Sequence, residues 1–331
     1  MGGKVFKDGS THRVSAAEFA VIRDRVVARL AADYPHRRIE VLPSYADKPD
    51  FGNLSVLLES ESIVSKLLAD LSNGRSILNN ERLTLNFEGF QVDVSFVPAS
   101  KFDTVLAYHS FNGMGGLIGK VAHSLGLVLH QDRMLYKVLD GDQLVEEIEV
   151  ANTWQQVLTL LGYSYARWSQ GFASLDEMFA FIASSDFFEP VDFMSAKPVV
   201  DGERPTVIQL FATYLQSASR PAAVSKPEVV LELLFDRIPG FRKEYERVAA
   251  FWEQRKEQMK VVRAKFSGHL VSEWTGRTGR ELGNLMKGIE TKFGGKDAVN
   301  AWAFQCSVDE IKLSVMLLHE ADLQPVRDTS Q

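Results

Sequence analysis

The sequence predicts an α+β fold, with a small mixed β-sheet and its helices followed by a mostly α-helical C-terminal region. In residues 1 to about 100, segments with a helical apolar period alternate with short apolar runs typical of strands. Beyond that point the helical period dominates. The chain has 331 residues, 45% of them hydrophobic and 24% charged, which are ordinary globular values and leave room for about two or three domains.

The N-terminal part opens with a predicted helix in which Ser15 and Glu18 have the spacing of a capping box. Further along, two apolar runs flank Glu88-Gly89, which predicts a hairpin that stops at Pro98. The predicted elements of this part are a helix at 14–33, strands at 38–42 and 54–58, a helix at 61–71 ended by Asn73-Gly74, and strands at 82–87 and 90–97.

The remainder is predicted to be helical. The segment 218–227 carries two prolines and small residues, which indicates a linker. We therefore expect three domains: 1–105 of mixed sheet and helix, 106–217 helical, and 228–331 helical. The predicted helices of the last two domains are 115–125, 153–162, 175–184, 206–216, 243–266, 279–293 and 307–318.

Charge is spread unevenly along the chain. The net charge is −6, yet between residues 236 and 296 there are 14 Lys and Arg against 8 Asp and Glu. Such a local excess indicates either a polyanion-binding surface or simply a solvated helical face. No apolar run is long enough to span a membrane, no signal peptide is evident, and Cys306 is the only cysteine, so we expect a cytoplasmic protein.

The glycine-rich run 113–120 does not have the spacing of a phosphate-binding loop or of a dinucleotide fingerprint. Gly115 and Gly119, four residues apart, are instead expected to let their helix lie close to a neighbour. The seven histidines do not have the spacing of metal ligands.

The residues that indicate chemistry lie between 43 and 97. Pro43-Ser44 follows a predicted strand, and Gly52-Asn53-Leu54-Ser55 leads into the next. The strand period places Asn53 and Ser55 on one side. About 40 residues later, Asp93 stands inside an apolar strand, where a carboxylate is costly unless something pairs with it.

These residues resemble the polymerase-β-like nucleotidyltransferase superfamily, and residues 1–6 and 48–52 look like phage-encoded members. Ser44 matches the family serine, Asn53 and Ser55 stand where the first two metal-binding acids are expected, and Asp93 matches the third. The resemblance implies a catalytic-type domain in which Ser44 and Lys48 bind nucleotide.

A second segment, 278–287, is similar to the C-terminal helical part of CCA-adding tRNA nucleotidyltransferases, which helps to carry the tRNA. That similarity implies an RNA-binding surface in the C-terminal domain. The basic residues expected to contact RNA phosphates are Arg255, Lys256, Lys260, Arg263, Lys265, Arg277, Arg280 and Lys287.

The replacement of two expected acids by Asn53 and Ser55 determines which function we expect. Two magnesium ions repel each other and need anionic oxygen ligands, but Asn and Ser are neutral and only Asp93 remains as a weak metal ligand, if it binds one at all. We therefore expect a degenerate protein, altered by natural descent rather than by engineering. It would bind nucleotide, tRNA-like RNA or a protein partner without efficient transfer and without a cofactor.

Two alternatives stay open. One is an active, Mg²⁺-dependent nucleotidyltransferase that adds a nucleoside monophosphate to RNA or protein. The other is a phage structural or interaction protein, located in the host cytoplasm, that reuses the fold for packing. No membrane partner is expected.

Overall fold

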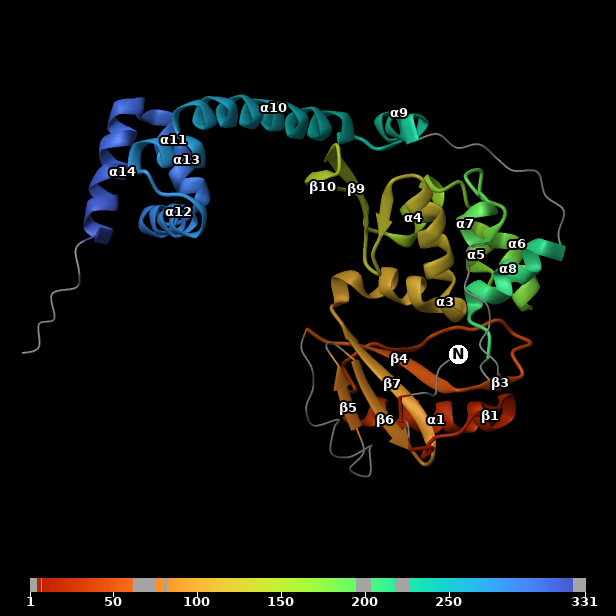
Figure 1. Ribbon diagram of the computed structural model, residues 1–331. Coiled ribbons are helices and arrows are strands. Elements are labelled where there is room, and N and C mark those ends of the chain that lie inside the picture. Colours follow the sequence, from red (N-terminus) through yellow and green to blue (C-terminus); the bar gives the residue numbers. More distant parts are fainter. Residues whose placement is uncertain are drawn as a thin grey trace, which may run out of the picture. The chain divides into compact units, whose positions relative to one another are not determined.

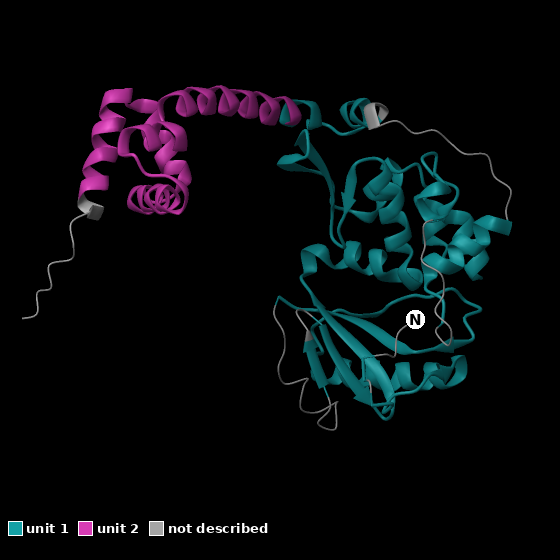
Figure 2. Ribbon diagram, viewed as in Figure 1, with its two compact units in different colours: residues 1–244 teal, residues 245–331 magenta. Residues whose placement is uncertain are grey.

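A computed structural model describes residues 5, 6, 8–61, 76–79, 82–194, 204–217 and 227–323. It confirms the mixed α+β class, with mixed sheet structure in the N-terminal region and helices towards the C-terminus. The chain divides into two compact units, residues 1–244 and 245–331 (Figure 2). This division differs from the three domains that we predicted, because the first two belong to one unit.

The N-terminal part of the first unit holds a five-stranded sheet, a two-stranded ribbon and one long helix. Its elements are β1 (Val14–Ser15), α1 (Ala16–Asp33), β2 (Ile39–Val41), β3 (Asp50–Phe51), β4 (Asn53–Glu59), β5 (Ser76–Asn79), β6 (Arg82–Phe87), β7 (Phe90–Val97) and the short 3-10 helix η1 (Ala99–Lys101).

The strands of the main sheet are ordered β2-β4-β7-β6-β5, and only the β4–β7 pair is parallel. Strands β1 and β3 form the separate antiparallel ribbon. The predicted strands and the hairpin at Glu88-Gly89 are therefore confirmed. The predicted helix at 61–71 lies outside the described residues apart from its first residue.

Helix α1 begins at the predicted capping box, in which the Ser15 hydroxyl accepts from the Glu18 amide and the Glu18 carboxylate accepts from the Ser15 amide. Its residues Val26 and Leu30 pack in one hydrophobic core with Leu54, Val56 and Leu58 of β4. The opposite face of the sheet is covered in part by helix α3 (Phe102–Ser124) (Figure 1).

Helix α3 is broken in its middle. Ser110 is extended, and Phe111, Asn112 and Gly113 follow with φ of 56°, 55° and 87°. Left-handed backbone costs roughly 1–2 kcal/mol for each non-glycine residue, so Phe111 and Asn112 are strained unless their surroundings hold them. The Phe111 amide donates to the Pro43 carbonyl at 2.7 Å, which connects the break to the loop that leaves β2.

The prediction of a helical middle domain at 106–217 is wrong in part, because this range also contains strands. A three-stranded antiparallel sheet occupies part of this range, in the order β10-β9-β8. Its hairpin turns at Gly141, a residue with positive φ between two aspartates, which is a turn signal that our helical prediction overlooked. Its strands are β8 (Leu127–Leu129), β9 (Met134–Asp140) and β10 (Gln143–Ala151).

Of the remaining helices of the first unit, three match the predicted segments 153–162, 175–184 and 206–216 to within a few residues, and the other three were not predicted. Phe179, Phe193 and Phe211 form part of their buried aromatic core. The predicted linker 218–227 lies outside the described residues except for its last residue, which begins α9. These helices are α4 (Trp154–Leu160), α5 (Tyr165–Ser169), α6 (Leu175–Ile182), α7 (Val191–Met194), α8 (Val207–Ser217) and α9 (Pro227–Arg237).

The second unit is helical, as predicted. Its core gathers Val262, Val271, Leu285, Ile289 and Ile311 from different helices. The helices are α10 (Phe241–Lys265), which begins just before the boundary between the units, α11 (Gly268–Thr275), α12 (Gly279–Phe293), α13 (Lys296–Gln305) and α14 (Val308–Leu323).

Gly115 and Gly119 were both expected to allow close packing, and the break in α3 requires glycine at the first of these positions. A Cβ on Gly115 would lie 2.3 Å from the backbone oxygen of Tyr108, on the other side of the break in the same helix. A Cβ on Gly119 would have only an ordinary contact at 3.9 Å, with Leu129. Close approach is therefore required at Gly115, but within its own helix rather than towards a neighbouring one.

This contact predicts opposite effects at two adjacent glycines. Gly115→Ala should destabilise the first unit by about 2 kcal/mol or more, because the backbone at Tyr108 must shift. Gly116→Ala is the matched control, since a Cβ there meets nothing within 4 Å and alanine favours helix by up to about 1 kcal/mol. Urea unfolding measures both, and equal effects would contradict the assignment.

Candidate functional site

The strand register brings the three family-like positions together, as expected. Asn53 is paired with Gln91 and Ser55 with Asp93 across the parallel β4–β7 pair. On the other side, Thr84 of β6 is paired with Asp93. Because side chains alternate along strands, these five residues lie on one face of the sheet, opposite the face packed by α1. We call them the polar cluster.

Asp93 is the centre of the polar cluster and is only 5% exposed. Its Oδ1 accepts from Thr84 Oγ1 at 2.7 Å and from Gln91 Nε2 at 3.1 Å. Its Oδ2 accepts from Asn53 Nδ2 at 2.7 Å and from Gln91 Nε2 at 3.0 Å. Asn53 Nδ2 also donates to Ser55 Oγ at 2.9 Å. Each carboxylate oxygen thus accepts two hydrogen bonds, all of them from neutral groups.

This donor set does not fit a pair of magnesium ions. Mg²⁺ needs oxygen ligands, but Asn53 turns its NH₂ group, not its carbonyl, towards Asp93. A metal on Asp93 would have to replace hydrogen bonds from Asn53, Thr84 or Gln91, and the site offers one anionic ligand against two dications. Among the described residues, no group of three or more His, Cys, Asp or Glu side chains could hold a metal ion.

The N-terminal segment reaches the edge of the polar cluster. The backbone amide of Val5 donates to Gln91 Oε1 at 3.2 Å. This contact orients the side-chain amide of Gln91 so that its NH₂ group faces Asp93. Nearby, Asn86 Nδ2 donates to the carbonyl of Ser10 at 3.1 Å. Neither contact was foreseen from the sequence, since nothing in the pattern of residues 5–12 indicates pairing with a distant hairpin.

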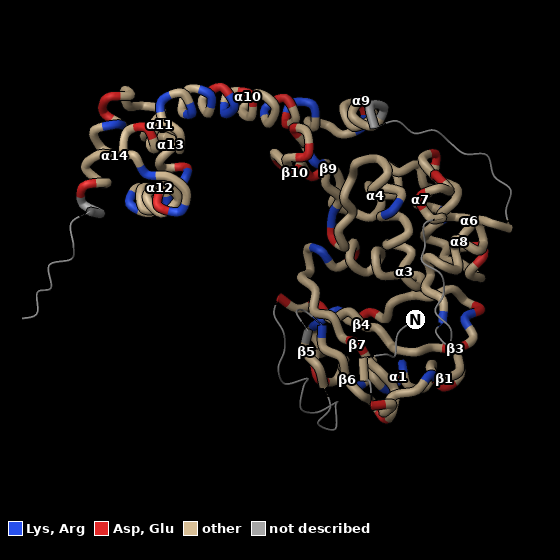
Figure 3. The backbone as a smooth tube through the Cα atoms, viewed as in Figure 1, with Lys and Arg blue, Asp and Glu red and all other residues tan. Residues whose placement is uncertain are grey.

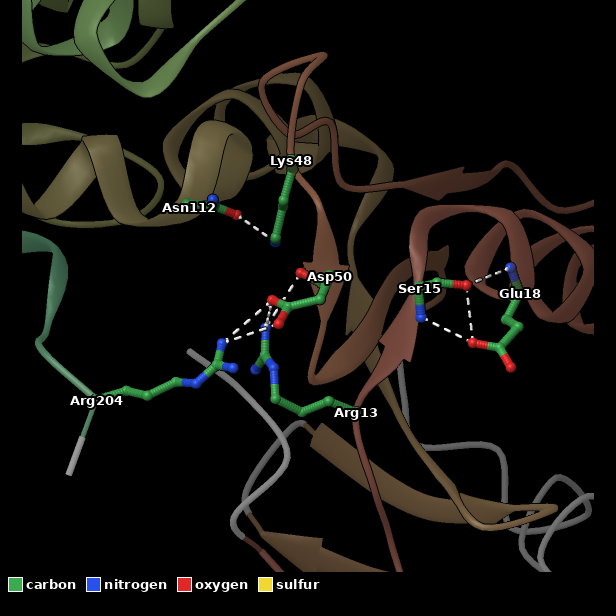
Figure 4. A network of polar contacts seen from close by, with 7 residues as sticks. All are labelled: Arg13, Ser15, Glu18, Lys48, Asp50, Asn112 and Arg204. Carbon is green, nitrogen blue, oxygen red and sulfur yellow. Dashed lines mark hydrogen bonds and ion pairs between the residues drawn. The ribbon is translucent and has the colours of Figure 1, made fainter. Parts of the chain in front are cut away.

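The predicted nucleotide-binding residue Lys48 lies in a pocket of about 220 Å³ within the first unit. Ser44, which we expected beside it, does not line this pocket, and its hydroxyl contacts the neighbouring carbonyl of Tyr45 at 3.5 Å. Figure 4 shows Arg13, Asp50 and Arg204 approaching one another, with Lys48 and Asn112 beside them. We call this cavity the cationic pocket; its polar lining residues are Arg13, Tyr45, Lys48, Asp50, Asn112 and Arg204.

Asp50 connects two arginines across the cationic pocket. Arg13 donates to its Oδ1 at 2.5 Å and to its carbonyl at 3.1 Å, and Arg204 donates to Oδ1 and Oδ2 at 3.2 and 3.0 Å. The hydrogen bond from Arg13 is the main reason that the pKa of Asp50 falls to about 2, with Arg204 adding to it. Position 50 is on the β1–β3 ribbon, away from the polar-cluster residues of β4.

Lys48 has a different environment. Its Nζ donates to Asn112 Oδ1 at 2.8 Å and lies 4.4 Å from the centre of the Phe51 ring. Burial, together with the nearby charge of Arg13 and against the opposing effect of Asp50, lowers the pKa of Lys48 to about 8. The acceptor Asn112 belongs to the left-handed break in α3, and no sequence pattern indicates that break, so this pair could not be predicted.

A larger cleft of about 1,010 Å³ lies beside the first half of α3. Trp154, Trp168 and Tyr165 line it, and Pro43 stands at its edge. Tyr165 is 38% exposed and stacks on Trp168 with ring centres 5.7 Å apart. Trp154 is only 4% exposed, so it belongs to the core as well, and Tyr165 is the ring that the cleft exposes most clearly.

Most of the basic residues predicted to bind RNA are engaged within the second unit. Lysine and arginine alternate with acids along α10 (Figure 3). Lys265 donates to the carbonyls of Phe304 and Cys306, and Arg277 also has contacts within the chain. The ion pairs are Arg255–Asp297 (2.7 Å), Lys256–Glu253 (2.6 Å) and Lys260–Glu257 (2.5 Å).

The other three predicted residues, Arg263, Arg280 and Lys287, are exposed, and none forms an ion pair within the part of the chain that the structure describes. The local excess of positive charge is therefore largely a set of paired, solvated side chains. A phosphate-contacting surface would reduce to these three.

No protein-family model and no curated protein matches this chain. In the described residues, no helix combines the length and apolar character needed to span a membrane. Three features of the first unit bear on function: the polar cluster, the cationic pocket, and the cleft lined by Trp154, Tyr165 and Trp168, which we call the aromatic cleft.

The environment of Lys48 predicts a pH effect with a definite sign. Because its folded-state pKa lies below the ordinary value of 10.5, the unfolded chain binds more protons between pH 8 and 10.5, and stability rises with pH in that window. Lowering a pKa by one pH unit is equivalent to about 1.4 kcal/mol. Relative to Lys48→Met, the wild type should gain on the order of 1–3 kcal/mol between pH 7 and 10.

Urea unfolding at several pH values measures this difference. Lys137→Met is the matched control, because Lys137 is 40% exposed and its carboxylate partner Glu147 is 4.0 Å away. Parallel stability curves for the wild type and Lys48→Met would show that the amine is not desolvated.

Proposed function

We propose that this chain is a degenerate nucleotidyltransferase-like protein that binds a nucleotide or RNA without transferring it. The observation that carries the proposal is the arrangement around Asp93. The three family-like positions converge on one sheet face, yet the carboxylate is held by Asn53, Thr84 and Gln91 through neutral hydrogen bonds. The convergence of these positions supports descent from a metal site. The one acid that remains, Asp93, accepts hydrogen bonds from neighbouring side chains in place of a metal ion.

The aromatic cleft supports a ligand with a flat ring. Its volume of about 1,010 Å³ is ample for a mononucleotide, given that pockets for drug-sized ligands measure about 300–1,000 Å³. Exposed aromatic rings such as Tyr165 stack on bases without regard to sequence. The edge of the cleft at Pro43 is one residue from Ser44, the position that matches the family serine.

Restoring the acids tests the proposal directly. Wild-type protein should bind nucleoside triphosphate equally well in Mg²⁺ and in EDTA, and should incorporate no labelled nucleotide into an RNA pool. Asn53→Asp combined with Ser55→Asp should make binding depend on Mg²⁺, since two anionic ligands return beside Asp93. Calorimetry and a labelling assay give the two readouts.

The same double variant with Asp93→Ala added is the control, and it should lose the Mg²⁺ dependence. Incorporation by the wild type that disappears in Asp93→Ala would replace the proposal with the active enzyme. Failure of the wild type to bind any nucleotide or RNA would favour the hypothesis in which the fold serves only for packing.

The charge pairing in the second unit predicts a limited salt dependence for any RNA binding. Substituting Gln at Arg263, Arg280 and Lys287 together should make the negative slope of log Kobs against log salt shallower by about 2, because each phosphate contact contributes roughly −0.7 to −0.9. Filter binding across a salt series measures the slope.

The matched control substitutes Gln at Arg255, Lys256 and Lys260, which already pair with acids, and should change the slope by less than about 1. A larger effect in the control than in the first variant would locate the RNA contact on α10 instead.

A further inference from the structure

The cationic pocket concentrates positive charge from three segments that are far apart in the sequence. Arg13 precedes β1, Lys48 lies in the loop before β3, and Arg204 precedes α8. Against these three cations stands one carboxylate, Asp50, which both arginines already share. With Lys48 protonated, the pocket carries an excess of two positive charges, and Figure 4 shows the side chains converging.

The pocket holds donor hydrogens that the described residues leave without an acceptor. The Nε of Arg13 is buried and has no hydrogen-bond partner among those residues. Lys48 Nζ has three hydrogens, and Asn112 Oδ1 accepts one of them. Leaving cationic donors desolvated and unpaired costs free energy, which the lowered pKa of Lys48 also reflects. A pocket built only for packing would not favour this arrangement.

Backbone strain holds part of the pocket in place. Asn112 has a left-handed φ of 55° and uses its side-chain oxygen to orient Lys48. Strained residues of this kind persist where surrounding structure fixes them, and they gather at ligand sites and switches. Here the strain accompanies a cavity and a charge excess, so three independent features point to one location.

We propose that the cationic pocket binds a phosphoryl group. A phosphate monoester carries a charge of about −1.5 to −2 at neutral pH, which would bring the pocket close to neutrality. Guanidinium groups bind phosphate oxygens through paired hydrogen bonds, and Asp50 holds two of them in position. The volume of about 220 Å³ suits a phosphoryl group with little else, so any larger part of the ligand would extend outside.

This inference does not rest on the proposed function, because none of the polar-cluster residues lines the pocket. Two sources of the phosphoryl group share the same chemistry. One is free phosphate or pyrophosphate, and the other is the phosphate end of a larger molecule such as a nucleoside monophosphate. Comparing the affinities of the two kinds of ligand separates these sources.

Calorimetric titration of the full chain with inorganic phosphate, pyrophosphate and AMP, at constant ionic strength, tests the proposal. We expect saturable binding of at least one probe, weakened about tenfold or more by Arg204→Gln and by Lys48→Gln. Arg204 is 61% exposed, so its variant should fold even where the Lys48 variant does not. Arg25→Gln is the matched control, since Arg25 pairs with Glu88 away from the pocket, and it should leave binding within about twofold.

AMP binding that is tighter than phosphate binding and is weakened by the pocket variants identifies the phosphate end of a larger ligand. Phosphate binding that is weakened by the pocket variants and is as tight as or tighter than AMP binding identifies a free phosphate site. In the second case the inference stands while nucleotide binding loses support. Binding that persists unchanged in both pocket variants, or no saturable binding of any probe up to about 10 mM, would overturn the assignment.

Discussion

The left-handed break in α3 is the constraint on which the arrangement of the first unit depends. Two non-glycine residues, Phe111 and Asn112, hold a conformation that costs free energy, and each is fixed by a contact with the loop after β2. Phe111 donates its amide to Pro43, and Asn112 accepts from Lys48. The break therefore joins the sheet to the helical part of the unit and at the same time positions the amine of the cationic pocket.

Two carboxylates of the same region show two ways of stabilising negative charge. Asp93 is buried and surrounded by amide and hydroxyl donors, whereas Asp50 is partly exposed and paired with guanidinium groups. The first arrangement excludes competing cations because its lone pairs are occupied. The second keeps cations close together and leaves some of their hydrogens unused. The anion site that we propose therefore lies in the loop beside the sheet rather than on the strand face.

The sequence predicted what local rules determine. Strand period was enough to place Asn53 and Ser55 on one face, and the capping box located the start of α1. That Asp93 lies beside them was implied only by the family resemblance, and the parallel β4–β7 register is what brings it there. The β8–β10 sheet was missed because its glutamate-rich last strand has weak apolar alternation. The cationic pocket could not be predicted, because Arg204 and Arg13 meet only through tertiary packing.

The loop of residues 43–50 links the aromatic cleft to the cationic pocket. Its start borders the cleft and contacts the break in α3, its middle supplies Lys48, and its end enters the β1–β3 ribbon with Asp50 paired to two arginines. Its backbone is further fixed by hydrogen bonds from residues 46 and 47 to the carbonyls of Phe172 and Ala173. A ligand in the cleft and an anion in the pocket would contact the same rigid loop. Coupling between them would require a second arrangement of that loop.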